Sequence, residues 1–203
     1  EFRRVLFRSI CWALAGVGLY SCSLDEPSYG KTTSDNYYQK ESDIEQALTG
    51  AYLQLRTTWN EYALNHYFVG DCSTDDALKG GGNDGDRAEV RDLSDFTIYT
   101  TNGEVGRRWE ILYRLINRCN DVIYYAPDAI GNEELLKRYA NEAKALRAFG
   151  YYCLVTTFGE VPLITTPMQP AEILQIPRSP LEKVYECIVS DLTDASALPA
   201  KGD

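Results

Sequence analysis

The sequence predicts an all-α protein made of stacked helical hairpins, interrupted by one long irregular loop. Four segments of the 203-residue chain carry apolar residues at the three-and-four spacing of an amphipathic helix. One of these segments is apolar on two faces, so we expect it to lie between two neighbouring helices. Short turns containing proline and glycine separate the helices, which favours helical hairpins.

The first helix is expected from about Asp43 to Thr57. Ser42 and Glu45 have the spacing of a capping box, in which two side chains pair with free backbone amides at a helix start. A single apolar stripe runs along the segment. It consists of Ile44, Ala47, Leu48, Ala51, Tyr52 and Leu55.

The second helix is expected from about Glu104 to Tyr125, with Pro127 and Gly131 ending it. Its apolar side consists of Val105, Leu112, Ile116, Cys119 and Ile123. Trp109 flanks this side, so we expect its ring in the core. The alternative is that the ring serves as a stacking surface for a ligand.

The third helix ends at Gly159, which can adopt the left-handed conformation of a C-cap, and Pro162 prevents continuation. Its first apolar stripe consists of Leu136, Tyr139, Ala140, Ala143, Leu146, Gly150 and Cys153. Its second stripe consists of Ala145, Phe149 and Tyr152. The small residues Ala143 and Gly150 would let a neighbouring backbone approach closely, as stacked hairpins require.

The fourth helix is expected to begin with Ser179 as N-cap, Pro180 at the first helical position and Glu182 completing a capping box. Its apolar stripe consists of Leu181, Val184, Tyr185, Ile188, Leu192 and Ala195. The apolar pattern of the four helices therefore indicates an all-α, solenoid-like arrangement.

The segment from Asn60 to Asn102 interrupts this arrangement and is too long for a simple connector. Loops of this length in compact domains usually carry function or are disordered. Its centre, from Lys79 to Asp86, is so rich in glycine that regular structure there would be costly. The same run resembles one turn of a calcium-binding glycine and aspartate repeat, so calcium binding stays open. We expect any ligand site of the chain to lie in this segment.

The N-terminal residues have the pattern of a bacterial export signal followed by a tether. Basic residues precede an apolar run from Ile10 to Tyr20 that is too short to span a bilayer. Leu19-Tyr20-Ser21-Cys22 resembles a lipobox, so residues 1–21 are expected to be a signal peptide and Cys22 the lipidated mature N-terminus. An ordinary signal with an incidental cysteine is the alternative. Residues 22–41 would then form a polar tether between the acyl anchor and the folded domain.

The composition argues against several classes of function. The formal net charge is −10, and removing the basic signal would make the chain more acidic still. Such a surface repels phosphate backbones, so we do not expect nucleic-acid binding. The sequence lacks a nucleophile elbow, a phosphate-binding loop and a zinc-peptidase motif, which argues against an enzyme, and we expect no cofactor.

The cysteines downstream of Cys22 do not have metal-ligand spacing, and the chain contains a single histidine, His66. Three of these four cysteines lie on apolar stripes, where a thiol behaves as a small apolar side chain. We therefore predict free buried thiols. Disulfides, which exported chains can form, are the alternative. The four cysteines are Cys72, Cys119, Cys153 and Cys187.

Four stretches of the chain together resemble the SusD/RagB family. The longest is the run from Asn141 to Ile164, which contains Glu-Ala-x-x-Leu-Arg-Ala-Phe-x-Tyr-Tyr-x-Leu-Val followed by Phe-Gly-Glu-Val-Pro-Leu-Ile. The other three are Cys22-Ser-Leu-Asp-Glu-Pro27 with Ala47-Leu-Thr-Gly-Ala-Tyr52, Trp109-x-x-x-Tyr113-x-x-Ile116-x-x-x-Asn120, and Pro177-Arg-Ser-Pro-Leu-Glu-Lys-Val-Tyr185 with Asp191-Leu-x-x-Ala195. Their order and spacing match the N-terminal part of the family and cover nearly everything after residue 20.

Members of this family are nutrient-binding lipoproteins of Bacteroidetes outer membranes. The resemblance implies a fold with tetratricopeptide-like helical pairs and a function in binding rather than catalysis. It implies a lipid-anchored cell-surface protein that captures an oligosaccharide for import through a TonB-dependent, SusC-like transporter. Because family members are much longer, we interpret residues 42–203 as an N-terminal helical-repeat domain truncated at its C-terminus. We interpret residues 1–9 as a cloning or assembly artefact.

Within the long loop, the resemblance favours Asp75, Asp76, Tyr99 and Asn102 as ligand contacts, with Arg87 as a lesser candidate. Aromatic faces suit the C–H surface of a sugar, while Asp, Asn and Arg side chains can pair with its hydroxyls. The alternative is a solvated, mobile loop in which Phe96 and Tyr99 plug the helical core. Two other functions stay open, namely capture of peptides within the same family and a stand-alone helical-repeat lipoprotein that acts as a protein–protein scaffold.

Overall fold

The computed structural model describes residues 37–56, 62–83 and 85–199, so the expected signal peptide, Cys22 and most of the tether lie outside the described residues. Its elements in chain order are α3 (Glu41–Tyr52), the 3-10 turn η1 (Leu53–Leu55), α4 (Tyr62–Gly70), η2 (Asp71–Ser73), α5 (Ala88–Ser94), α6 (Gly103–Tyr125), η3 (Ala126–Asp128), α7 (Glu133–Phe158), α8 (Pro170–Ile173) and α9 (Leu181–Ala195). The all-α prediction is confirmed. None of the helices within these ranges has the length and apolar character needed to cross a bilayer.

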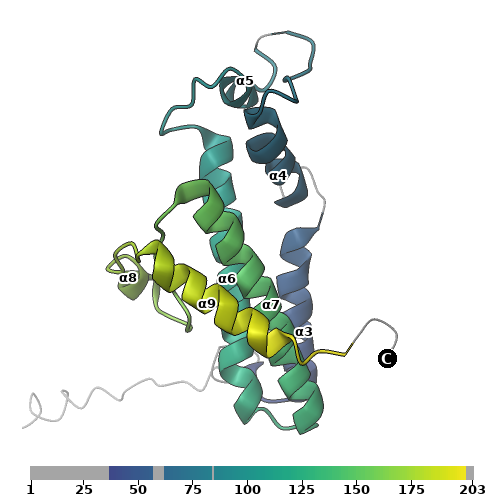
Figure 1. Cartoon of the computed structure of the whole chain (residues 1–203). Coiled ribbons are helices and arrows are strands. Elements are labelled where there is room, and N and C mark those ends of the chain that lie inside the picture. The colour runs from purple at the N-terminus through teal and green to yellow at the C-terminus, as the bar shows by residue number, and fades with distance from the viewer. Residues whose placement is uncertain (1–36, 57–61, 84, 200–203) are drawn as a thin grey trace, which may run out of the picture. The chain divides into compact units, whose positions relative to one another are not determined.

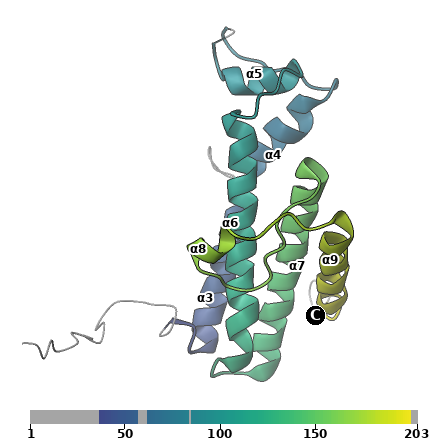
Figure 2. The same cartoon turned by 90° about the vertical axis from the view of Figure 1, so that its left-hand side faces the viewer.

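The helices α6 and α7 form a central hairpin joined by the short η3 segment (Figure 1). Helix α3 packs against both members of this hairpin, and α9 packs against α7. Figure 2 shows α3, α6, α7 and α9 side by side. These four helices are thus stacked as in tetratricopeptide-like pairs, as the sequence pattern predicted.

Two clusters of buried apolar side chains hold these helices together. The first joins α3 to the α6–α7 hairpin and consists of Ile44, Leu48, Ala51, Leu115, Cys119, Val122, Ala126, Leu136, Ala143 and Leu146. The second joins the hairpin to α9 and consists of Leu112, Ile116, Ala148, Tyr151, Cys153, Leu154, Val155, Val161, Val184 and Ile188. Burial of each large aliphatic side chain stabilises the fold by about 1.5–3 kcal/mol, so these clusters are the main cohesive contribution.

Helix α7 does lie between neighbours, but its second buried face differs from the predicted one. Phe149 and Tyr152 are exposed. The face toward α9 is instead formed by buried residues that include Arg147 and Tyr151. A charged residue breaks the apolar pattern, so counting apolar positions selected the wrong stripe. The helix ends at Phe158, and Gly159 follows it with the positive φ expected, 72°, although its ψ of −127° lies outside the left-handed helical conformation that was predicted.

The predicted capping residues of two helices are wrong. Helix α3 begins at Glu41, and the Asp43 carboxylate accepts from the backbone N–H of Lys40 at 3.0 Å, so the Ser42–Glu45 box is not the one used. Helix α9 begins at Leu181 with Pro180 as N-cap. The backbone N–H of Ser179 instead donates to the Val161 carbonyl at 3.0 Å.

The fourth predicted apolar stripe is only partly buried. Val184 and Ile188 are in the core, whereas Leu181, Tyr185 and Leu192 are exposed. The same helix also carries Asp191, which is buried although it is charged. Three of the six residues of the predicted stripe are therefore exposed to solvent among the described residues.

The interruption between Asn60 and Asn102 is more ordered than predicted. It contains the helices α4 and α5, which pack against each other, and α4 also packs against α6. Among its described residues, 74–83 and 85–87 at its glycine-rich centre and 95–102 just before α6 are without regular structure. Figure 1 shows α4 and α5 gathered near the N-terminal end of α6.

The four cysteines of the described residues are free thiols, and three of them are buried, which confirms the prediction. Burial raises the pKa of the Cys119 thiol to about 12. It therefore stays protonated and unreactive in the folded chain at neutral pH.

Candidate functional site

Three of the five predicted site residues lie around the start of α6, and Asn102 is the residue that fixes the geometry there. Its Oδ1 accepts from the backbone N–H groups of Glu104 at 3.1 Å and Val105 at 3.2 Å, so Asn102 is the N-cap of α6. Its Nδ2 donates to the Glu89 carbonyl in α5 at 2.9 Å. Asn102 is only 6% exposed, and both ends of its carboxamide are bonded to backbone. It therefore joins α5 to α6, while its predicted role as a ligand contact stays a prediction.

Replacing Asn102 with alanine should lower the free energy of unfolding by about 1–2 kcal/mol, because the cap and the link to Glu89 are both lost. The matched control is Asn132→Ala. Asn132 caps α7 through the N–H groups of Glu134 and Leu135 and forms no side-chain bond to another helix in the described residues. Urea unfolding of both variants checks the difference. Equal losses would show that the α5–α6 link contributes nothing.

Arg87 is held at the junction of α4, α5 and α6. It adopts a left-handed backbone conformation, with φ of 47°, as the N-cap of α5. Its guanidinium lies 4.8 Å from the centre of the Phe68 ring and 3.6 Å from Oε1 of Glu104. Glu104 is itself fixed by buried Asn65, whose Nδ2 donates to its carbonyl at 2.8 Å and to its carboxylate at 3.2 Å. A cation with one face on an aromatic ring and an edge toward solvent is placed to contact a polar ligand.

The segment between α5 and α6 presents aromatic rings to solvent. Tyr99 is 65% exposed and Phe96 is 64% exposed, so the alternative in which these rings plug the core is wrong. Phe96 also has a φ of 57°. A bulky residue in this region costs about 1–3 kcal/mol and is typically found where function requires the strain. Phe96 was not among the expected ligand contacts, because backbone strain leaves no signal in the residue pattern.

Asp75 and Asp76 lie in the exposed turn after η2. The turn is closed by Thr74, whose hydroxyl donates to the Asp71 carbonyl at 2.7 Å and accepts from the Asp76 N–H at 3.3 Å. Although η2 packs against α5, no hydrogen bond or ion pair among the described residues connects Asp75 or Asp76 to the other three candidates. The structure therefore brings Arg87, Tyr99 and Asn102 to one helix end and leaves the two aspartates on a neighbouring turn.

The glycine-rich centre of the interruption is closed by its own side chains. The Asn83 Oδ1 accepts from the N–H groups of Gly85 at 2.9 Å and Asp86 at 3.1 Å, and Lys79 Nζ donates to the Asn83 carbonyl at 2.8 Å. The Asp86 carboxylate accepts from the Gly82 N–H at 3.4 Å. Within residues 37–56, 62–83 and 85–199, no group of three or more His, Cys, Asp or Glu is placed to hold a metal ion.

A groove of about 490 Å³ lies between α6 and the segment 162–174, which includes α8. Trp109 and Tyr113 line it, opposite Met168 and Leu174. Trp109 also packs edge-on against Phe158, and both rings are partly buried against the second core cluster, so Trp109 lies at the edge of the core with part of its ring in the groove. Sequence analysis missed this groove, because the segment that forms its far wall has no helical periodicity.

Comparison with known proteins places the chain in a family. Residues 23–201 match the SusD-like family described as "Starch-binding associating with outer membrane", and the chain belongs to this family. Two curated relatives are SusD-like proteins P2 and P25 of Formosa agariphila. P2 is 30% identical over 179 residues, which is 86% of this chain and 34% of the relative. P25 is 26% identical over 185 residues, covering 85% of this chain and 34% of the relative.

Solved structures show the same relationship. A laminarin-binding SusD-like protein superposes with a TM-score of 0.70 at 31% identity, covering 78% of this chain and 34% of that protein. Surface glycan-binding protein A from Bacteroides fluxus superposes with a TM-score of 0.67 at 29% identity, covering 81% and 34%. The chain thus spans about a third of the length of these relatives. Both relatives are named for what they bind.

Proposed function

We propose that this chain is part of a cell-surface protein that captures a glycan and releases it unchanged. The observation that carries the proposal is the pair of solvent-exposed rings, Phe96 and Tyr99, at the end of α6 in a chain of the starch-binding SusD-like family. Flat aromatic faces match the C–H surfaces of pyranose rings. The names of the laminarin-binding and glycan-binding relatives support carbohydrate as the ligand class.

The proposed mechanism is binding to a site that is already formed before the sugar arrives. Tyr99 stacks on the sugar ring, while Arg87, Asp75 and Asp76 bond its hydroxyls. Asn102 sets the geometry by capping α6 and holding α5 against it. Sugars lose well-hydrated hydroxyls on binding, so the affinity is modest and depends on this pre-organisation.

The protein would work at the outer membrane, with which its family is associated. We propose that an acyl chain on Cys22 anchors it at the cell surface and that residues up to about 41 act as the tether. A TonB-dependent, SusC-like transporter would take the captured oligosaccharide from it. The stacked helices α3, α6, α7 and α9 would form the scaffold that holds the site over this partner.

Replacing Tyr99 with alanine tests the site. Because Tyr99 is exposed, the variant should fold normally and lose retardation in native gels containing laminarin or starch, with affinity at least about tenfold weaker. Tyr124→Ala is the matched control, since Tyr124 is 55% exposed near the other end of α6. Retardation of Tyr99→Ala equal to that of Tyr124→Ala would remove Tyr99 from the site. Absence of retardation of the unaltered chain in every glycan would count against carbohydrate capture.

A further inference from the structure

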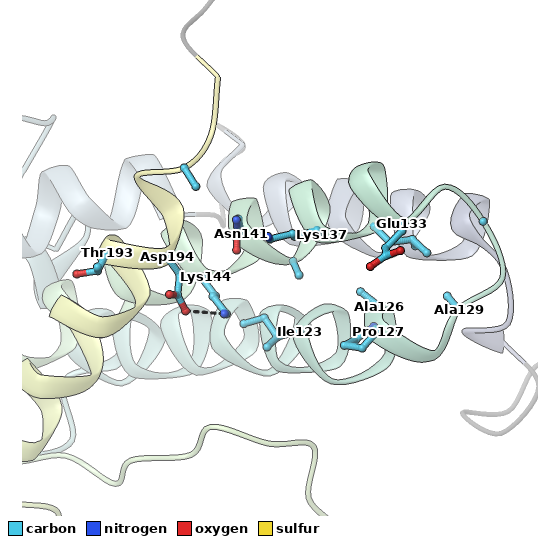
Figure 3. Close-up of a pocket in the computed structure, with 14 residues that line it drawn as sticks. Ile123, Ala126, Pro127, Ala129, Glu133, Lys137, Asn141, Lys144, Thr193 and Asp194 are labelled. Atoms are coloured by element: carbon cyan, nitrogen blue, oxygen red, sulfur yellow. Dashed lines mark hydrogen bonds and ion pairs between the residues drawn. The ribbon is translucent and has the colours of Figure 1, made fainter.

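A cleft of about 750 Å³ lies at the opposite end of the α6–α7 hairpin from the candidate glycan site. One wall is a row of polar residues on α7, namely Glu133, Lys137, Asn141 and Lys144, and α9 forms the facing wall with Thr193 and Asp194 (Figure 3). The ion pair between Lys144 Nζ and Asp194 Oδ2, at 2.6 Å, joins the two walls. The 23 residues of α6 separate this cleft from the glycan site by about 33 Å, so both can be occupied at once.

The polar residue that distinguishes this cleft is Asn141. It is only 8% exposed, and its carboxamide forms no hydrogen bond with any residue in the part of the chain that the structure describes. The other buried asparagines differ in this respect, since Asn65, Asn102 and Asn120 each bond backbone through their side chains. A buried polar group without a partner is unfavourable, and native structures rarely keep one without a reason. The amide of Asn141 is therefore available to a ligand in the cleft.

The lining of the cleft selects the chemistry of that ligand. The lining includes no aromatic ring, so the stacking surface that a sugar needs is missing. Its two lysines are balanced by Glu133 and Asp194, so it does not attract a highly charged anion. Its floor is made of small or aliphatic residues such as Ala126, Pro127 and Ala140, which allow close approach of a backbone.

A polypeptide in extended conformation fits these requirements. Each residue of an extended strand can direct its N–H and C=O to the same side, as in a closely spaced pair of an antiparallel sheet. A carboxamide supplies the complementary acceptor and donor. The row from Glu133 to Lys144 is on the order of 16 Å long, which matches about five extended residues.

We propose that this cleft binds an extended segment of a partner polypeptide and that Asn141 bonds both the N–H and the C=O of one residue in it. The charged residues at either side of Asn141 fix the direction of the segment, with Lys137 near its carbonyl groups. The site is independent of the glycan site and of any sugar.

Nuclear magnetic resonance of the uniformly ¹⁵N-labelled chain tests the proposal with acetyl-pentaalanine amide as the probe. This peptide offers backbone groups and no polar side chain. Millimolar peptide should shift the side-chain NH₂ signals of Asn141 and the backbone signals of Ala140 and Thr193 in a saturable manner. Asn141→Leu should weaken binding at least about tenfold. This variant removes an unpaired amide, so it should fold at least as well as the unaltered chain.

The matched control is Asn117→Leu, because Asn117 is exposed on α6 and lines the other groove. This variant should bind the peptide as the unaltered chain does. Three outcomes would overturn the proposal: no saturable shift at Asn141, equal peptide binding by Asn141→Leu, or shifts at Asn141 caused by laminarin oligosaccharide and not by peptide.

Discussion

Replacing either Arg147 or Asp191 with alanine is expected to lower the free energy of unfolding by about 3–5 kcal/mol, because each change leaves an uncompensated buried charge. The guanidinium of Arg147 forms two bonds of 2.8 Å with the Asp191 carboxylate, and both side chains are buried between α7 and α9. Arg147 Nη1 also donates to Asn120 Oδ1 at 2.9 Å and to the Thr165 carbonyl at 3.0 Å. One residue therefore links α6, α7, α9 and the loop before α8.

The network continues into that loop, which makes the expected loss larger than that of an isolated pair. Asn120 Nδ2 donates to the Ile164 carbonyl at 2.9 Å. The buried hydroxyl of Tyr151 donates to the same carbonyl at 2.8 Å and accepts from the Ile164 N–H at 2.7 Å. Removing Arg147 leaves Asp191 buried without its cation and frees the Asn120 oxygen, so several partners are affected together.

Chemical denaturation of the single variants measures this effect, and the chain offers a matched control. Lys144 and Asp194 form an ion pair between the same two helices but are more exposed, with side-chain exposures of 24% and 49%. Alanine in place of Lys144 should cost no more than about 1 kcal/mol, because exposed ion pairs contribute little. If Arg147→Ala and Lys144→Ala lose similar amounts, the buried network does not hold α9 as described.

Replacing Gly150 with leucine is expected to cost about 3 kcal/mol, because α6 and α7 approach each other closely at this residue. A Cβ atom at Gly150 would lie 3.0 Å from Ile116 Cγ1 and 3.5 Å from Leu115 Cδ2. Both neighbours are themselves fully buried, so they cannot move into open space. Leucine adds three more carbon atoms to this contact, and the helices must separate to accept them.

The control for Gly150 is Gly106→Ala on α6. A Cβ atom at Gly106 meets nothing within 4 Å, and the residue is exposed. Alanine there should raise the free energy of unfolding by about 0.5–1 kcal/mol, because it removes backbone freedom from the unfolded chain. Thermal unfolding should thus shift in opposite directions for the two variants. A neutral Gly150→Leu would contradict the close packing of the central hairpin.

The parts of the fold that sequence analysis predicted correctly are those stabilised by local apolar periodicity. Leu112, Ile116 and Cys119 share one face of α6, and all three are buried. The second buried face of α7 was not predictable in this way. Its key residue, Arg147, is stable in the core only because Asp191 lies opposite, 44 residues later in the chain. A pattern of apolar residues contains no information about such a pairing.

The structure of the interruption before α6 could not be predicted from apolar periodicity either. Helix α5 has seven residues, too few to be stable alone, and it is held by the bond from Asn102 to Glu89. Of the candidate site, the sequence indicated the segment before α6, and the structure shows the ring of Tyr99 exposed there, while the ligand contacts themselves stay a prediction. The residue pattern does not show that the Asn102 carboxamide is hydrogen-bonded to backbone groups at both ends. Nor does it show that Arg87 and Phe96 adopt positive φ values.

The most direct test of the proposed glycan capture is hydrogen–deuterium exchange of the chain with and without a laminarin oligosaccharide. We expect slower exchange in the segment from Asp95 to Gly103 and around Arg87, with no change at the turn between α6 and α7. Tyr99→Ala should abolish this protection, while Tyr124→Ala should keep it. Protection confined to the groove beside Trp109 or to the cleft around Asn141, or protection unaffected by Tyr99→Ala, would contradict the placement of the sugar at the start of α6.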